Sequence, residues 1–156
     1  YTQRGREREK TRKSLKERIG DESFTAIPSN FLRSEALSKL SGSASKLLWE
    51  FVRQLGKDNN GDLQASWQVL KDRGWNSKAT LNRALKELRE AGIITQTRQG
   101  GRNRCSLYAL TFIAIDTCKG KHDARPSTRP LGLWHDARKE YRDVIPKPNK
   151  EEKNSA

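Results

Sequence analysis

The chain has few of the residues that build metal centres and disulfide frameworks, since its 156 residues include two cysteines and two histidines. Cys105 and Cys118 are 13 positions apart with no clustered histidine, and His122 and His135 do not complete a zinc-finger spacing. Nothing in the first residues is typical of a secretory signal, so we expect reduced cysteines in a cytoplasmic protein. We also expect no metal and no cofactor.

Long hydrophobic runs and catalytic motifs are missing as well. No apolar run approaches the roughly 20 residues that cross a bilayer, so we expect no membrane partner. The sequence contains no phosphate-cradling loop, no paired metal carboxylates and no nucleophile motif. Histidine stands beside aspartate at positions 122–123 and 135–136, but adjacent side chains rarely face one another. We therefore expect no enzymatic activity.

Apolar residues are also scarce. They make up 33% of the chain, as do charged residues, whereas an ordinary globular domain is roughly 45–50% apolar. Part of the chain must therefore be solvated. The net charge of +13 should attract polyanions, because each phosphate that a protein neutralises releases condensed counterions. Charge alone leaves open the alternative of a basic surface with no defined target.

Both ends of the chain are polar and basic. Residues 1–20 contain eight basic and three acidic residues, so we expect residues 1–22 to form a basic, disordered arm. A solvated helix with no partner is the alternative. Residues 118–156 contain four of the five prolines, and we expect a mostly disordered basic tail there. One apolar group in this tail could bind a protein partner or pack back on the domain. Its members are Leu131, Leu133, Trp134, Tyr141, Val144 and Ile145.

The middle of the chain, residues 23–117, has the patterns of a folded domain. A short helix is expected at about 30–39. Apolar residues in 44–55 recur at the spacing of one helical stripe, which is the clearest periodicity in the sequence. The next segment, 62–65, suits a brief strand.

Two further helices are predicted in close succession. Ser66 can cap the first, and Gly74 would end it. Asn76 or Ser77 can cap the second, which would close at positions 91–92. The face of this second helix that we expect to be buried comprises Leu81, Ala84, Leu85 and Leu88.

Two extended runs, 93–98 and 105–112, are rich in β-branched or aromatic residues and predict a hairpin. Its tip contains Gly100 and Gly101, which we expect to adopt the positive φ that a tight hairpin turn requires. The order is helix, helix, short strand, helix, turn, helix, hairpin. It predicts a mainly α fold with a small β-hairpin, that is, a winged helix-turn-helix domain with disordered basic tails.

The second of the paired helices has an outward face suited to DNA. A helix-turn-helix lays this helix in the major groove, where asparagine can contact adenine and arginine or lysine can contact guanine. Serine at the helix start suits a phosphate. A solvated amphipathic helix is the alternative, and Glu87 and Glu90 fit it. The predicted DNA-binding residues here are Ser77, Lys78, Asn82, Arg83 and Lys86.

The hairpin strengthens the DNA-binding prediction. Arg98, Arg102, Asn103 and Arg104 gather around its glycine-rich tip, and no acidic residue lies in 91–115. A purely structural hairpin does not need three arginines there. A wing that lies along the DNA backbone or enters a minor groove does. We therefore expect double-stranded DNA as the partner.

The sequence also resembles a known group of proteins. The stretch LNRALKELREAGII (81–94), followed by TRQGGRNR (97–104) and LYALT (107–111), is similar to winged-helix proteins of bacterial mobile elements. These include phage and plasmid replication proteins and regulators of integrated elements. The LxxLxxxGxI portion is common to many winged helices, and the TRQGGRN and LYALT portion is more distinctive. The resemblance covers about residues 24–116 and implies DNA binding.

We therefore expect a sequence-specific transcriptional regulator associated with the nucleoid or a plasmid. An origin-binding replication or partition factor of a plasmid, phage or integrated element is the alternative. A winged helix used for protein–protein contact fits the residues least. The sequence leaves a homodimer open.

Overall fold

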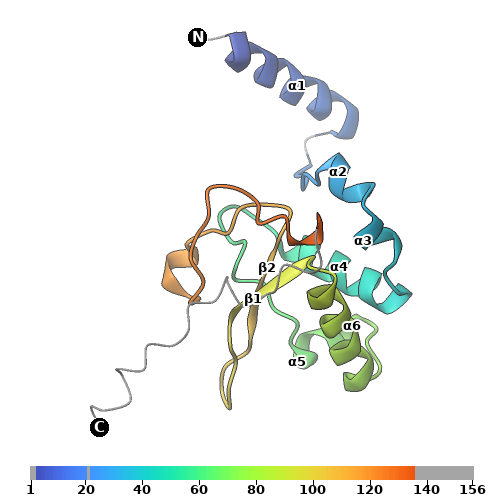
Figure 1. Cartoon of the computed structure of the whole chain (residues 1–156). Coiled ribbons are helices and arrows are strands. Elements are labelled where there is room, and N and C mark those ends of the chain that lie inside the picture. Colours follow the sequence, from blue (N-terminus) through green and yellow to red (C-terminus); the bar gives the residue numbers. More distant parts are fainter. Residues whose placement is uncertain (1–2, 21, 136–156) are drawn as a thin grey trace, which may run out of the picture.

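The computed structural model describes residues 3–20 and 22–135 (Figure 1). Within these residues the fold is mainly helical with one two-stranded antiparallel sheet, as predicted, and it contains six α-helices. No helix in this part of the chain has the length and apolar character to cross a membrane. The helices are α1 (Gln3–Ile19), α2 (Ser29–Leu32), α3 (Glu35–Ser38), α4 (Gly42–Gln54), α5 (Trp67–Leu70) and α6 (Lys78–Glu90), with the 3-10 turns η1 (Lys71–Arg73), η2 (Cys118–Gly120) and η3 (Leu133–His135). The strands are β1 (Ile94–Arg98) and β2 (Leu107–Leu110).

Helix α4 buries the apolar stripe that the sequence predicts. Ser41 caps its start, because the Ser41 hydroxyl accepts a hydrogen bond from the backbone N–H of Ala44 at 3.2 Å. Leu47, Leu48 and Phe51 are each at most 4% exposed. The helix packs against α6, so the stripe forms the interior between these two helices.

Helix α6 begins where the sequence predicts. The Ser77 hydroxyl accepts a hydrogen bond from the Thr80 N–H at 3.3 Å, which satisfies one of the amides at the helix start. The predicted buried face is confirmed for the residues nearest to α4, and Leu85 at its edge is half-buried. The fully buried members are Leu81, Ala84 and Leu88.

The hairpin pairs in one register. Ile94 lies opposite Leu110 and Gln96 opposite Tyr108, with a bulge just after Gln96. The expected strand at 62–65 is reduced to one paired residue. Leu63 exchanges both backbone hydrogen bonds with Tyr108, at 3.2 and 2.8 Å. A third extended segment therefore borders β2.

The predicted conformation of the hairpin tip is wrong, because neither Gly100 nor Gly101 has a positive φ. The turn is closed by two backbone hydrogen bonds between Gly101 and Arg104, of 2.8 and 3.3 Å. Gly100 is needed for a different reason. A Cβ there would lie 2.6 Å from the Ser106 nitrogen and 2.7 Å from the Arg104 carbonyl oxygen. Glycine is required here because the two sides of the hairpin approach each other closely, and not because the turn is left-handed.

Two other local predictions differ from the structure. The single helix expected at 30–39 is divided into α2 and α3, because the Ser34 hydroxyl accepts a hydrogen bond from Leu37 N–H and starts a new helix. Ser66 precedes α5, but its side chain makes no capping hydrogen bond. Gly74 ends the following turn in the left-handed region at φ 81°, as predicted.

The structure forms a helix where the sequence predicts a disordered arm. Residues 3–19 make α1, and none of its side chains is buried. Lysine, arginine, glutamate and glutamine are good helix formers, so local propensity favours α1 although no core supports it. Gly20, at φ 79°, ends the helix.

Residues 118–135, predicted to belong to the tail, pack on the domain instead. Trp134 is 8% exposed, and its ring meets the Phe31 ring edge-on at 5.4 Å between centroids. The backbone N–H of Asp123 donates to the carbonyl of Thr97 at 2.9 Å. The folded domain thus reaches beyond the predicted boundary at 117, because Trp134 fills a place in the core. The members of the apolar group that lie outside the described residues are Tyr141, Val144 and Ile145.

Asn60 links the hairpin to the segment that follows it. Its side chain is 1% exposed, accepts a hydrogen bond from Leu110 N–H at 2.8 Å, and donates to the carbonyls of Leu110 and Ala114 at 3.0 and 2.8 Å. Its backbone exchanges hydrogen bonds with Asp116. The amide therefore satisfies backbone groups at the end of β2 that the ladder leaves unpaired.

Asn60→Asp should destabilise the domain, because a carboxylate would face two carbonyl oxygens in place of an amide donor. We expect the free energy of unfolding to fall by about 2–4 kcal/mol, measured by urea denaturation. Asn103→Asp makes the same chemical change at the exposed hairpin tip and should cost less than about 0.5 kcal/mol. Equal effects of the two substitutions would contradict this role for Asn60.

Candidate nucleic-acid interface

The outward face of α6 presents the polar side chains that the sequence predicts. Asn82, Arg83 and Lys86 are all exposed, because the opposite side of the helix is buried against α4. Their spacing places an amide, a guanidinium and an ammonium group within about one helical turn. This face can therefore donate several hydrogen bonds to one ligand surface.

The hydrogen bonds within this face are weak. The Arg83 Nη2 donates to Thr80 Oγ1 at 3.3 Å. Lys86 Nζ lies 3.8 Å from a carboxylate oxygen of Glu90, and the two side chains are 77% and 66% exposed. An exposed pair of this kind contributes about 0–1 kcal/mol. Arginine and lysine can therefore exchange these partners for a ligand at little cost.

Residues at the N-terminal end of α6 are held by the preceding elements. The exposed ammonium group of Lys78 lies 5.9 Å from the centre of the Trp67 ring on α5. Ser77 is half-buried and caps the helix. The Ser77 hydroxyl oxygen accepts a hydrogen bond from the first turn of the helix, and the hydroxyl proton can be donated to a phosphate. Both predicted residues thus lie at the helix start, where first-turn amides favour anions.

The hairpin tip is exposed and braced from below. Arg102, Asn103 and Arg104 are exposed. Beneath them, the Gln96 side-chain amide donates to Gln99 Oε1 at 2.9 Å and to Ser106 Oγ at 3.2 Å. These bonds connect the two strands where the ladder is irregular. The tip is therefore held by its own hydrogen bonds while its cationic groups project into solvent.

Arg98 does not join the cationic groups at the tip. Its Nη2 donates to the Cys105 carbonyl at 2.9 Å and its Nη1 to the Lys121 carbonyl at 3.0 Å. The side chain is half-buried at the base of the hairpin. Arg98 thus joins the hairpin to the segment that contains η2. Its side chain has a structural role and does not lie with the other predicted site residues at the tip.

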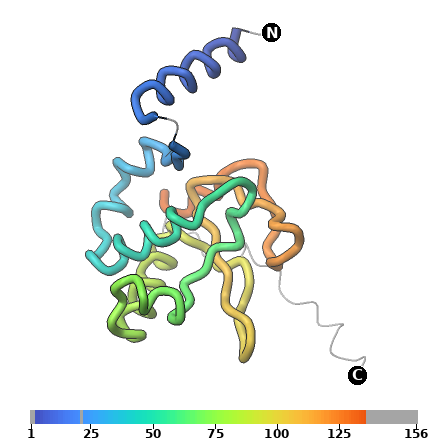
Figure 2. Tube along the Cα trace, turned by 180° about the vertical axis from the view of Figure 1, so that it is seen from behind, coloured from blue at the N-terminus to red at the C-terminus, as the bar shows by residue number. Residues whose placement is uncertain are grey.

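Helix α6 and the hairpin lie at the same end of the molecule. Figures 1 and 2, which view the chain from opposite sides, both show them next to each other, with the hairpin tip projecting from the body. Helix α1 lies at the other end in both views. One elongated ligand can therefore reach both α6 and the hairpin tip.

Glu87, which by sequence alone fits a solvated helix face, fixes the position of α6. Its carboxylate accepts hydrogen bonds from the backbone N–H and the hydroxyl of Ser41, each at 2.7 Å. The hydroxyl and then the amide of Ser41 hold the pKa of Glu87 below its ordinary 4.5. Glu87 therefore binds the N-cap of α4. A long-range contact of this kind has no signal in a single sequence.

The turn before α6 is held by charged residues of α4. Glu50 accepts hydrogen bonds from Arg73 at 2.7 Å and Arg53 at 3.0 Å. Burial raises the pKa of Glu50, but hydrogen bonds and charges of Arg73 and Arg53 outweigh it and keep the pKa below 4.5. Lys46 donates to the Gly74 carbonyl at 2.8 Å. Together these contacts fix the turn between α5 and α6 against α4.

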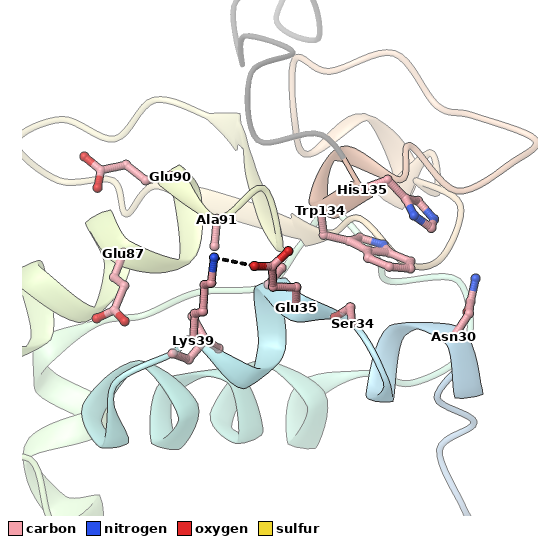
Figure 3. A pocket seen from close by; sticks show the side chains of 11 residues that line it. Asn30, Ser34, Glu35, Lys39, Glu87, Glu90, Ala91, Trp134 and His135 are labelled. Carbon is pink, nitrogen blue, oxygen red and sulfur yellow. Dashed lines mark ion pairs between the residues drawn. The ribbon is translucent and has the colours of Figure 1, made fainter.

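A cavity of about 780 Å³ lies elsewhere, between α2, α3, the C-terminal end of α6 and η3 (Figure 3). Its lining includes Glu35, Glu87 and Glu90, with Lys39 paired to Glu35. The balance of charge in this cavity is acidic, which disfavours a phosphate ligand. Among the described residues, no three metal-ligating side chains come together.

Comparison of the chain with protein-family models, with characterised proteins and with solved structures gave no match. A functional assignment therefore depends on the chemistry and geometry of its own residues.

Glu87→Gln should lower the free energy of unfolding by about 1 kcal/mol at neutral pH, because a neutral amide accepts weaker hydrogen bonds from Ser41. The Glu87 pKa is lowered in the folded state. Its contribution is therefore complete above the unfolded pKa and is lost as pH falls through the folded pKa. Denaturation at pH 7 and near pH 3 should show the difference between the two proteins closing in acid.

Glu90→Gln is the matched control, since Glu90 has only a weak exposed pair with Lys86. It should change stability by less than about 0.5 kcal/mol at either pH. A Glu87→Gln effect that persisted unchanged in acid would contradict the role of the charge.

Proposed function

We propose that this chain is a winged helix-turn-helix protein that binds double-stranded DNA in a sequence-specific manner, as a transcriptional regulator does. The order of elements supports this proposal. Helix α4, the paired residue Leu63, helices α5 and α6, and the β1–β2 hairpin follow one another as in a winged helix. In this arrangement α6 is the recognition helix and the hairpin is the wing.

The exposed face of α6 supports base reading in the major groove. Helix α6 is about 20 Å long, and the groove, about 12 Å wide, accepts an α-helix. Asn82 can make two hydrogen bonds to adenine, and Arg83 or Lys86 can contact guanine. The core of a protein-contact patch is depleted in charged residues, whereas this face is rich in them.

The wing supports backbone binding at the same duplex. Arg102 and Arg104 project from a tip that is exposed and braced, and no acidic residue lies in 91–115 to repel phosphates. Contacts of this kind position a protein without reading bases. The single observation that carries the proposal is the common location of α6 and the hairpin tip at one end of the molecule.

Two substitutions separate the proposed roles. Asn82→Ala should reduce discrimination at one base position by about 1–3 kcal/mol, measured by selection of bound sites from random duplexes. Arg102→Gln with Arg104→Gln should weaken binding to every sequence. It should also lower the salt slope of log K by about 2, because each lost phosphate contact contributes about 0.9.

The matched control for the wing is Arg33→Gln with Lys39→Gln, which removes the same charge from exposed positions at the ends of α2 and α3. This variant should keep most of the salt slope. If it matched the wing variant, general charge and not the wing would bind DNA. Identical effects of the Asn82 and wing variants on base preference would contradict the groove assignment.

A further inference from the structure

Helix α1 is the most strongly charged element of the fold and has no role in its core. Its 17 residues include eight basic and three acidic side chains, and none is buried. The helix is about 25 Å long. A helix that is polar all round gains nothing from packing. Its composition therefore requires another explanation than the stability of the domain.

Three of the eight basic residues of α1 form a ridge. Arg4, Arg8 and Arg12 follow one another at every fourth position, so they lie along one side of the helix, about 6 Å apart. They line one shallow surface together with Glu7, Thr11 and Leu15. Within the described part of the chain, none of these three arginines pairs with a carboxylate.

The ridge has the dimensions and sign of a binding surface for a nucleic-acid backbone. It spans about 12 Å along the helix, and one strand of a duplex offers a phosphate about every 3.4 Å. Three guanidinium groups can therefore each reach a different phosphate of the same strand. Arginine is well suited to this contact, because its planar fork donates two hydrogen bonds to one phosphate.

The position of α1 separates this ridge from the proposed recognition surface. Both views of the chain show α1 projecting from the end opposite to the hairpin tip. Gly20 ends the helix, and residues 22–28 connect it to α2 without a helix or strand. A duplex lying across α6 and the tip therefore leaves α1 at the opposite end of the molecule.

We propose that α1 is a second DNA-binding element, which holds the phosphate backbone of a duplex segment other than the one bound by α6 and the wing. This proposal rests on the proposed function and adds a bridging activity to it. A membrane fits α1 less well, because its larger apolar residues are Leu15 and Ile19 and it lacks an apolar face. A second copy of this helix would repel it by charge.

The test is the number of duplexes that the full chain binds at low salt, measured by analytical ultracentrifugation. The duplex has about 14 base pairs, which is long enough for one groove-bound helix. We expect two duplexes per chain. Arg4→Gln with Arg8→Gln and Arg12→Gln should reduce the number to one. The matched control carries the same charge loss on the other side of α1, at Arg6, Lys10 and Lys13. Replacing these with glutamine should leave two.

The outcomes distinguish this proposal from the one on which it rests. One duplex per chain, lost in the triple variant of Asn82, Arg102 and Arg104, would overturn the bridging role and leave the proposed function standing. A full chain that bound only one duplex, with that duplex lost in the ridge variant and kept in the triple variant, would overturn the proposed function as well as the bridging role. Two duplexes retained by the ridge variant, or lost equally in its control, would overturn the role of the ridge. Ridge-dependent binding to phosphatidylserine vesicles with unchanged duplex number would assign α1 to a membrane.

Discussion

The packing of α6 against α4 is the constraint on which the candidate interface depends. Once Leu81, Ala84 and Leu88 are buried, the helical period leaves no choice about which side chains face solvent. Rotation of α6 by one residue would turn Asn82 toward the core. The Glu87 carboxylate on Ser41 adds a second restraint, since it joins α6 to the first turn of α4.

The hairpin depends on polar contacts made by parts of the chain that surround it. Asn60 fixes the end of β2 from the preceding loop, and Arg98 joins the base of the hairpin to the segment after it. The small size of Gly100 then lets the two sides of the hairpin approach each other closely below the tip. Buried or half-buried polar groups thus hold the hairpin from both sides, while its exposed arginines make no contribution to the core.

Local sequence patterns predict most of the central helices and the hairpin, but they do not predict long-range contacts. The stripe of α4, the Ser77 cap and the buried face of α6 follow from periodicity and capping chemistry, and so do the approximate limits of the hairpin. The partners of Arg98, Glu87 and Trp134 do not, because each pairs residues far apart in sequence. Composition also misled at both ends. High charge predicts disorder in residues 1–22, although good helix formers produce α1. Proline and charge predict a disordered tail from residue 118, although the segment up to residue 135 packs on the core.

The native cysteines allow a direct measurement of the central claim, that α6 and the hairpin face DNA. Cys105 is exposed beside the tip and Cys118 is buried, so a thiol-directed photocrosslinker will modify Cys105. We predict crosslinks from Cys105 to a bound duplex, and none from the same reagent on Lys39→Cys in a Cys105→Ser background. Crosslinks from position 39 without any from Cys105 would contradict the account.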